Sequence, residues 1–489
     1  MKSLAALLLS LAIPASLAFA SPPVPQFTGS NARPYFVTAS IPSGSATLPS
    51  GAVVRFAETK LPVNPPERRS DALTAQVPAT NYADWFEPWT PWPHQGSGND
   101  PICTIDLSPH KDEAGTLILG GLFWQFIPQS VTVASSNGAK TFLKNVDYKY
   151  NPEWGQIASL GGRLGELGKA EVRVSYEYIL QRLDLAQVDA AGKVTLKPGQ
   201  SVLVCPDLPD PDPGCAPVAG VYLTPWRYVP LLHSPVDTGS SATGPTAPPV
   251  FQADVYPIHP APPVAPVNPD AVAALKKKLA AGEAVKIAFL GDSLSVGAEA
   301  GEWWTDLWTD KNLGFPSRLI VALRKQFPKA AITPLTGFQG STTTKYGLIT
   351  LNTSVLPANP DLVFIEFALN DAGGPLGGKP NVSVENYKTN LTAMVRQARA
   401  AGAAVILIFP YPPNPLAQKG QIARRVPDYR QAMLDVANAE KAGFADVYTE
   451  WQNQATRGLP PESQLHNCIN HPGPRGHKLI ADLLLRFFE

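Results

Sequence analysis

Four residues near the ends of predicted strands and helices have the types that acyl transfer requires. Ser293 and Gly340 follow predicted strands, Asn370 follows a third, and His471 precedes the last predicted helix. Ester cleavage needs a nucleophile, a base and hydrogen-bond donors directed at the oxyanion. The sequence therefore predicts Ser293 as nucleophile and His471 as base. The backbone N–H groups of Ser293 and Gly340, with the side-chain amide of Asn370, would form the oxyanion hole.

Alternating apolar strands and amphipathic helices would position these residues. The predicted strands are residues 285–290, 331–335, 361–367, 403–409 and a segment near 445, and the predicted helices are residues 270–281, 316–326, 384–401, 429–442 and 476–488. Repeated strand–helix units favour a parallel sheet covered by helices on both faces. Ligands of such sheets bind beyond the carboxyl ends of the strands, where we expect the four residues named above.

The motifs around these residues resemble those of the SGNH (GDSL-type) hydrolases. They are Gly291-Asp292-Ser293-Leu294, the glycine block 337–343, Ala368-Leu369-Asn370-Asp371, and Asn470-His471-Pro472 with Gly476-His477. The resemblance covers about residue 285 to the C-terminus and implies a flavodoxin-like three-layer α/β fold with esterase, lipase or carbohydrate deacetylase activity. We expect Asp292 to hold the turn structurally. The α/β-hydrolase elbow is excluded because position 295 is serine, where that motif has glycine.

One departure concerns the catalytic histidine. The family commonly has an aspartate three residues before it, and here that position is Cys468. A neutral acceptor can still orient an imidazole. We therefore predict a Ser293–His471 dyad whose Nδ1–H is bound by a backbone carbonyl or by the side-chain oxygen of Asn467 or Asn470. A carboxylate from elsewhere, with Glu462 nearest in sequence, is the alternative.

The N-terminal half has a different organisation. Residues 1–20 combine Lys2, an apolar run and Ala18-Phe19-Ala20, which is typical of a secretory signal peptide. Residues 21–233 read as a β-rich, sandwich-like accessory domain, since residues 171–178 alternate with the period of a strand. A proline-rich linker is expected at 234–268, and the catalytic domain at 269–489. We therefore expect a two-domain protein secreted to the extracellular space or periplasm.

The chain has four cysteines, which are expected to pair in an oxidising compartment. Closeness in sequence favours a bridge between Cys205 and Cys215, leaving Cys103 for Cys468. His466, Cys468, His471 and His477 also suggest zinc, but their spacing fits no usual zinc pattern. We predict no metal and no cofactor.

Composition narrows the class of partner. Lys+Arg and Asp+Glu both number 40, so the net charge of the chain does not attract nucleic acid or an anionic membrane surface. No segment after residue 20 is long and apolar enough to span a membrane. We expect a secreted serine esterase that removes O-acetyl or other short acyl groups, for example from a polysaccharide. The alternatives are a broad lipase or arylesterase, and a surface-binding protein whose hydrolase domain is inactive.

Overall fold

The computed structural model describes most of the chain after the expected signal peptide. The described residues are 36–78, 104–107, 111–112, 115–116, 118, 125–127, 130–151, 155–225, 250–301, 304–374, 378–415 and 420–489. Residues 1–20 and Cys103 lie outside them.

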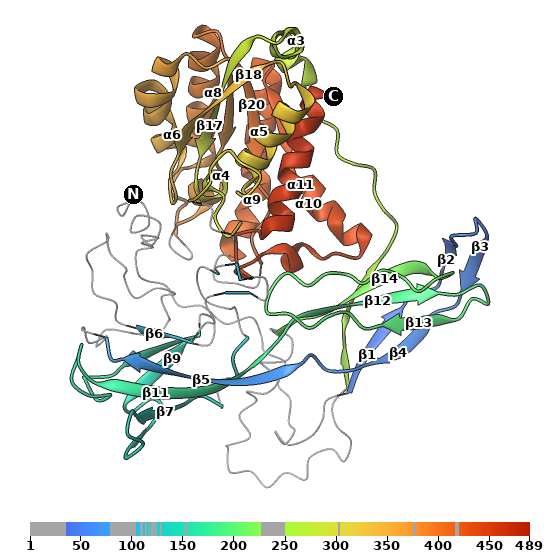
Figure 1. Ribbon diagram of the computed structural model, residues 1–489, viewed down its shortest axis with the longest axis vertical. Helices are drawn as coiled ribbons and strands as arrows, with labels where there is room; N and C mark the ends of the chain where they lie inside the picture. The colour runs from blue at the N-terminus through green and yellow to red at the C-terminus, as the bar shows by residue number, and fades with distance from the viewer. Residues whose placement is uncertain are drawn as a thin grey trace.

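The C-terminal domain is built on one parallel sheet of five strands (Figure 1). The strands are β17 (Ala284–Gly291), β18 (Ala331–Phe338), β19 (Leu362–Glu366), β20 (Ala404–Phe409) and β21 (Gly443–Asp446). Their order is β18-β17-β19-β20-β21, so the first strand lies between the second and the third. The connection after β17 runs to β18 on one side and the connection after β19 runs to β20 on the other, which opens a crevice at the carboxyl ends of β17 and β19.

Helices cover both faces of this sheet. They are α3 (Ala273–Ala281), α4 (Ser293–Val296), α5 (Phe315–Gln326), α6 (Thr344–Thr350), α7 (Leu369–Ala372), α8 (Val384–Ala400), α9 (Gly420–Glu440), α10 (Val447–Asn453) and α11 (Pro474–Leu485). Shorter turns are η1 (Pro269–Val272), η2 (Leu351–Val355), η3 (Leu356–Ala358), η4 (Gln454–Arg457), η5 (Pro461–Gln464) and η6 (Arg486–Phe488). The predicted alternation of strands and helices is confirmed.

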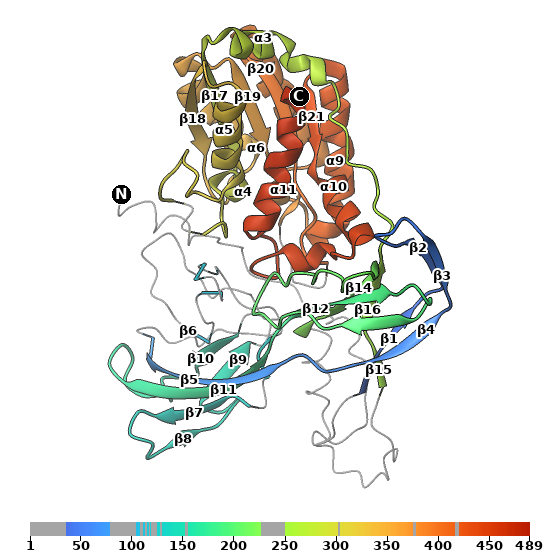
Figure 2. The same ribbon diagram turned by 45° about the vertical axis from the view of Figure 1, so that its right-hand side comes forward.

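Alternate residues of β17 explain the three layers. Ile287 and Phe289 enter the core that also contains residues of α3, α5 and α11, whereas Ala288 and Leu290 enter the core shared with α8 and α9. Side chains of a strand point alternately to its two faces, so an unbroken apolar strand is one buried on both. Figures 1 and 2 show the helices on either side of the sheet.

Helix α9 is longer than predicted. It begins at Gly420 and contains Pro427, whereas the sequence predicted a start at Tyr429. An internal proline costs a helix one hydrogen bond. Burial of Ile422 and Val426 in the core beside α8 offsets that cost, so tertiary packing overrides the local signal.

The N-terminal region is β-rich, as predicted. Its strands are β1 (Phe36–Ile41), β2 (Gly44–Thr47), β3 (Val53–Phe56), β4 (Thr59–Val63), β5 (Arg68–Gln76), β6 (Thr104–Asp106), β7 (Thr132–Ser135), β8 (Thr141–Phe142), β9 (Tyr148–Asn151), β10 (Gln156–Ser159), β11 (Glu171–Ile179), β12 (Arg182–Val188), β13 (Val194–Lys197), β14 (Ala216–Leu223), β15 (Val250–Gln252) and β16 (Asp254–Pro257). In the described part they form small, mostly antiparallel sheets of two to four strands.

Part of the expected linker 234–268 belongs to these sheets. Strand β15 pairs with β1, and β16 pairs with β14. The proline-rich composition concealed these short strands, because edge strands tolerate proline where no ladder hydrogen bond is needed. The chain therefore completes the N-terminal sheets before it enters the C-terminal domain.

The two regions are in direct contact. A Cβ atom placed on Gly220 of β14 would lie 2.0 Å from the carbonyl oxygen of Gly458, so glycine permits the backbones to touch. Figures 1 and 2 both place α4 at the end of the C-terminal domain that faces the N-terminal strands.

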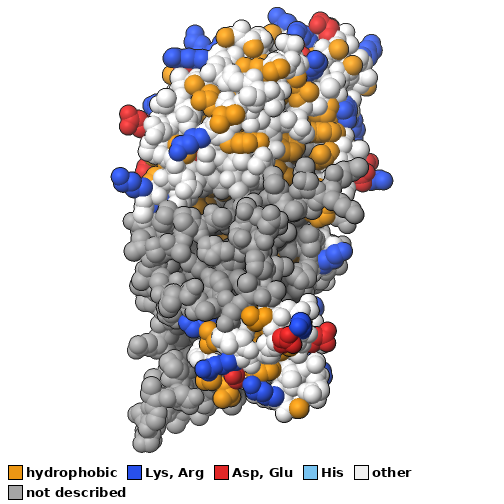
Figure 3. Space-filling model, turned by 90° about the vertical axis from the view of Figure 1, so that its left-hand side faces the viewer, with side chains coloured by type: hydrophobic (Ala, Val, Ile, Leu, Met, Phe, Trp, Pro, Cys, Tyr) orange, Lys and Arg blue, Asp and Glu red, His pale blue; other side chains and the backbone are white. Residues whose placement is uncertain are grey.

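The described surface carries dispersed charge. Figure 3 shows acidic and basic side chains scattered over one face of the molecule, in keeping with the zero net charge. No helix within the described ranges is long and apolar enough to cross a membrane.

Candidate active site

A tight turn after β17 presents the predicted nucleophile. The Asp292 carboxylate caps α4 by accepting the backbone N–H of Leu294 at 3.0 Å, and Ser293 is the first residue of that helix. Gly291 has no room for a side chain, since a Cβ atom there would lie 2.1 Å from Ser295 Oγ and 2.9 Å from the Glu366 carbonyl oxygen. Local crowding thus requires glycine two residues before the serine.

Ser293 lies within hydrogen-bond distance of His471. Their Oγ and Nε2 atoms are 2.9 Å apart, although the residues lie 178 positions apart in the sequence. Ser293 is partly exposed, and His471 is 6% exposed. A hydroxyl within hydrogen-bond reach of an imidazole nitrogen is the arrangement that serine nucleophiles use.

Asn467 occupies the other side of the imidazole. Its Oδ1 accepts the backbone N–H groups of Ile469, Asn470 and His471 at 2.9–3.0 Å, which fixes the orientation of the amide. Its Nδ2 lies 3.3 Å from His471 Nδ1 and donates to Asn470 Oδ1 at 3.2 Å. The expected contact through an amide oxygen is therefore wrong for Asn467, because backbone N–H groups occupy that oxygen.

This contact decides which imidazole nitrogen is protonated. An amide nitrogen has only protons to offer, so Nδ1 accepts from Asn467 and the proton of a neutral ring resides on Nε2. A general base needs a lone pair on Nε2. The resting arrangement thus stabilises the tautomer opposite to the one that accepts a proton from Ser293.

The predicted oxyanion residues come from the ends of the neighbouring strands. Gly340 lies in the turn after β18, and Asn370 lies in α7 after β19. The Asn370 Nδ2 group donates to Asp292 Oδ2 and to the Thr342 carbonyl, both at 3.0 Å. Both of its protons are thus engaged, and donation to an oxyanion requires release of one of these acceptors.

A buried acid that the sequence reading missed lies beneath this turn. Glu366, at the end of β19, is 1% exposed and its Oε2 accepts the Ser295 hydroxyl at 3.0 Å. Burial, followed by the charge of Asp292, raises the pKa of Glu366 well above its usual range. Its one sequence signal was a carboxylic acid at the end of an otherwise apolar strand.

Asp371 supports the start of α6. Its carboxylate accepts the backbone N–H of Thr344 at 3.1 Å and the hydroxyl of the same residue. Burial raises the pKa of Asp371 to about 7, against the opposing effect of these hydrogen bonds. The acidic residue next to Asn370 is thus a structural partner of the helix that follows the glycine block.

A second buried cluster stands behind the histidine loop, residues 465–471. His466 Nδ1 lies 2.6 Å from Glu299 Oε2, and His466 Nε2 lies 3.1 Å from Asp112 Oδ2. Burial alone lowers the pKa of His466, but hydrogen bonds to Asp112 and Glu299 outweigh it and raise the pKa to about 9. His466 is therefore an imidazolium at neutral pH. No sequence pattern indicates this cluster, because its members are far apart along the chain.

The cysteine predictions require correction. Cys205, Cys215 and Cys468 are all free thiols. Cys205 lies against Gly473, where an added Cβ would be 3.1 Å from its sulfur, so it faces the hydrolase domain rather than Cys215. The Cys468 sulfur accepts from the side-chain amide of Gln181 at 3.0 Å. Short sequence separation favoured the wrong pairing because tertiary contacts direct these thiols elsewhere.

The histidines that suggested zinc serve different contacts. His477 is buried, and its Nε2 donates to the Ala298 carbonyl at 3.1 Å while its Nδ1 accepts the Phe315 N–H at 3.2 Å. Burial lowers the pKa of His477 to about 4, so it is neutral. His466 binds carboxylates and His471 faces Ser293. Within the described residues no three His, Cys, Asp or Glu side chains form a metal-binding group.

Aromatic residues follow the nucleophile turn. Trp308 stacks on Phe289 with ring centroids 5.6 Å apart and so contributes to the core. Trp304 is 41% exposed.

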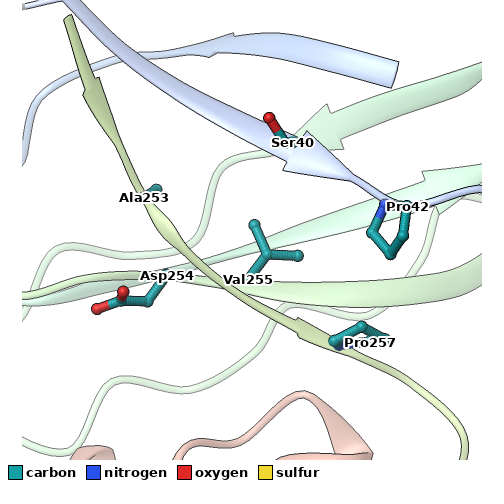
Figure 4. A pocket seen from close by; sticks show the side chains of 6 residues that line it. All are labelled: Ser40, Pro42, Ala253, Asp254, Val255 and Pro257. Carbon is teal, nitrogen blue, oxygen red and sulfur yellow. The ribbon is translucent and has the colours of Figure 1, made fainter. Parts of the chain in front are cut away.

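A pocket elsewhere, between β1 and β16, is lined by Ser40, Pro42, Ala253, Asp254, Val255 and Pro257 (Figure 4). It contains none of the residues described above.

Comparisons with known proteins match the C-terminal part of the chain. Residues 289–479 match the model of the GDSL-like Lipase/Acylhydrolase family. A search of curated proteins found no match. Similar solved structures include Axe2, an acetylxylan esterase from Geobacillus stearothermophilus, with 20% identity, a TM-score of 0.36, and coverage of 42% of this chain and 94% of that chain. LAE5, an alpha/beta hydrolase enzyme from the metagenome of Lake Arreo, Spain, has 22% identity with the same TM-score of 0.36 and the same coverage, 42% and 94%.

Proposed function

The C-terminal part of this chain belongs to the GDSL-like lipase/acylhydrolase family, whose members hydrolyse carboxylic esters, and from this premise we propose how its site works. Ser293 is the nucleophile and His471 is the base. The observation that carries this assignment is the 2.9 Å approach of Ser293 Oγ to His471 Nε2 at the carboxyl end of the sheet. Asp292 holds the nucleophile turn through Leu294.

Hydrolysis proceeds by two acyl transfers. In the ring form that carries its proton on Nδ1, His471 Nε2 accepts the proton of Ser293 Oγ as this oxygen bonds to the ester carbonyl carbon, and the carbonyl electron pair moves to the carbonyl oxygen. The backbone N–H groups of Ser293 and Gly340 bind this oxyanion, joined by the Asn370 amide once it releases an acceptor. Collapse expels the alcohol, which takes the proton from His471, and water then repeats the sequence on the acyl-enzyme.

Asn467 makes this catalyst slower than one with a carboxylate. The base-competent ring carries its proton on Nδ1, which would oppose the protons of Asn467 Nδ2. A carboxylate there would instead stabilise the imidazolium that forms as Ser293 gives up its proton. We therefore expect modest turnover and a preference for activated esters.

The substrate we propose is an O-acetyl or other short acyl ester, for example one carried by a polysaccharide outside the cell. The signal-like segment 1–20, the zero net charge and the additional β-rich region support this choice. A series of nitrophenyl esters from acetate to palmitate tests it. Activity highest on acetate or butyrate supports the proposal, whereas a preference for long chains would identify a lipase.

Labelling with a fluorophosphonate tests the assignment of the nucleophile. The wild-type chain should be labelled at Ser293 and hydrolyse nitrophenyl acetate. Ser293→Ala should lose labelling and at least about 10³-fold in kcat while keeping its fold. Labelling at another serine, or wild-type turnover by Ser293→Ala, would disprove the assignment.

A non-catalytic binding protein is the second candidate, and the donor contact from Asn467 to His471 favours it. This alternative predicts neither labelling of Ser293 nor hydrolysis of activated esters. The same experiment therefore separates the two functions.

A further inference from the structure

His466 joins three parts of the molecule that are distant in sequence. Its Nδ1 binds Glu299, which lies in the segment after α4 and is fully buried. Its Nε2 binds Asp112 of the N-terminal region. Its backbone N–H donates to the carbonyl oxygen of His471 at 2.7 Å. The nucleophile segment, the catalytic histidine and the N-terminal region thus meet at one residue, His466.

The Asp112 side chain is built to hold this position. Its Oδ1 accepts the backbone N–H of Thr116 at 2.7 Å, in a turn that also includes the Gly115 N–H to Asp112 carbonyl bond at 3.0 Å. The other oxygen, Oδ2, is thereby directed at His466. A carboxylate anchored on one oxygen loses little further freedom when it binds a cation with the other.

The rest of the histidine loop also rests on the N-terminal region. Cys468 and Ile469 belong to the apolar core of that region, together with residues such as Phe126 and Leu180. Cys468 adopts φ 60° and its sulfur accepts from Gln181, while Tyr222 donates to the same glutamine at 2.5 Å. Cysteine at positive φ persists only where its surroundings determine the conformation.

The hydrolase domain holds the same loop through its backbone. Asn414 binds the Cys468 carbonyl through its side chain at 2.9 Å and the Ile469 carbonyl through its N–H at 2.8 Å. The Tyr411 hydroxyl binds the Asn470 carbonyl at 2.6 Å. The hydrolase domain therefore fixes the carbonyls of the loop, while the N-terminal region contacts the side chains at 468 and 469 and shares the side chain at 466 with Glu299.

From these contacts we infer that Asp112 is a positioning residue for ester hydrolysis: acting through His466, it sets the distance between His471 and Ser293. The N-terminal region is then part of the catalytic architecture rather than only an accessory. A displacement of about 1 Å at reacting groups can cost about 10²-fold in rate. This inference rests on the proposed esterase function.

A double-mutant cycle on the full chain tests whether Asp112 acts through His466. Asp112→Asn keeps the size of the side chain but presents amide protons to His466, and it should lower kcat for nitrophenyl acetate about ten- to hundredfold with KM changed less than threefold. His466→Gln should lower kcat similarly. In the His466→Gln background, Asp112→Asn should change kcat less than threefold, because the connection is already broken.

Asp207→Asn is the matched control. Asp207 is also an aspartate of the N-terminal region that pairs with the hydrolase domain, through Arg475. Its side chain is 87% exposed, and its described contacts do not include residues 465–471. This variant should keep kcat within twofold. Near-ultraviolet circular dichroism checks folding, and if Asp112→Asn fails to fold, Asp112→Glu, which keeps the charge but moves it, should show the same loss in kcat.

The outcomes separate the two levels of the argument. An active wild-type enzyme with unchanged kcat in Asp112→Asn, or in Asp112→Glu where the former does not fold, would overturn the inference alone. Additive losses in the double variant would also overturn it, since Asp112 would then act independently of His466. A wild-type chain without ester hydrolysis would instead overturn the proposed function, and the inference with it.

Discussion

The side-chain nitrogen of Asn467, not its oxygen, lies 3.3 Å from Nδ1 of His471, the proposed base. The oxygen is held by three backbone N–H groups of the following residues, so the amide cannot turn over without breaking all three bonds. This relationship places a donor where a catalytic triad has an acceptor.

Asn467→Asp should therefore raise activity. One carboxylate oxygen can keep the three backbone hydrogen bonds, while the other accepts Nδ1–H and stabilises the imidazolium. We expect kcat for nitrophenyl acetate to increase about tenfold or more. Asn470→Asp is the comparison: its side chain contacts Asn467 but not the ring, so kcat should change less than threefold. A large loss in Asn467→Asp would mean that donation to Asn470 holds the loop.

Cys468→Asp should fail as a repair, although it restores the family's residue at the family's position. The side chain at 468 is fully buried in the core of the N-terminal region, facing the neutral amide of Gln181. Among the described residues no cation faces this side chain to stabilise a carboxylate, so we expect a loss of about 2–4 kcal/mol in the free energy of unfolding by urea. Aspartate tolerates positive φ better than cysteine, so backbone strain would not explain that loss.

Cys468→Ser supplies the control for this substitution. It keeps the size of the side chain and an acceptor for Gln181, and should cost about 1 kcal/mol. Equal stability of Cys468→Asp and the wild type would contradict the buried position of this side chain.

Asn370→Ala should lower kcat by about 10²–10³-fold, the usual effect of losing an oxyanion donor. The amide must move from the Thr342 carbonyl to the developing oxyanion, so the loss should fall on kcat more than on KM. Steady-state kinetics on nitrophenyl acetate measures it. A loss below tenfold would restrict Asn370 to supporting Asp292 and Thr342.

The protein should lose stability as the pH rises above neutrality. The pKa of His466 is about 9 when folded and near 6.5 when unfolded, so the folded state binds its proton more tightly. This contribution is fully present below about pH 6.5 and disappears as pH rises through 9, with a magnitude on the order of 3 kcal/mol. Urea unfolding at pH 6.5 and 9.5 measures it.

His466→Gln provides the reference for that measurement, because it removes this proton and leaves other titrating groups in place. The difference in unfolding free energy between the two pH values should shrink by about the same amount. An identical pH dependence in His466→Gln and the wild type would show that His466 is not charged in the folded state.

The sequence by itself determined the hydrolase fold and the identity of the residues that meet at its edge. Period and apolarity specify strands buried on both faces, and motifs at strand ends identified Ser293, Gly340, Asn370 and His471, because parallel strands end at a common edge.

What surrounds His471 was decided by tertiary structure. Which side-chain atom of Asn467 faces the His471 ring is determined only when the loop folds, because the backbone N–H groups of residues 469–471 then bind the amide oxygen. Asp112, Glu299 and His466 gave no pattern, because a buried ion cluster has no sequence period and forms through contacts between distant segments. Cys205 and Cys468 were misassigned for the same reason: separation along the chain says little about which side chains the folded regions bring together.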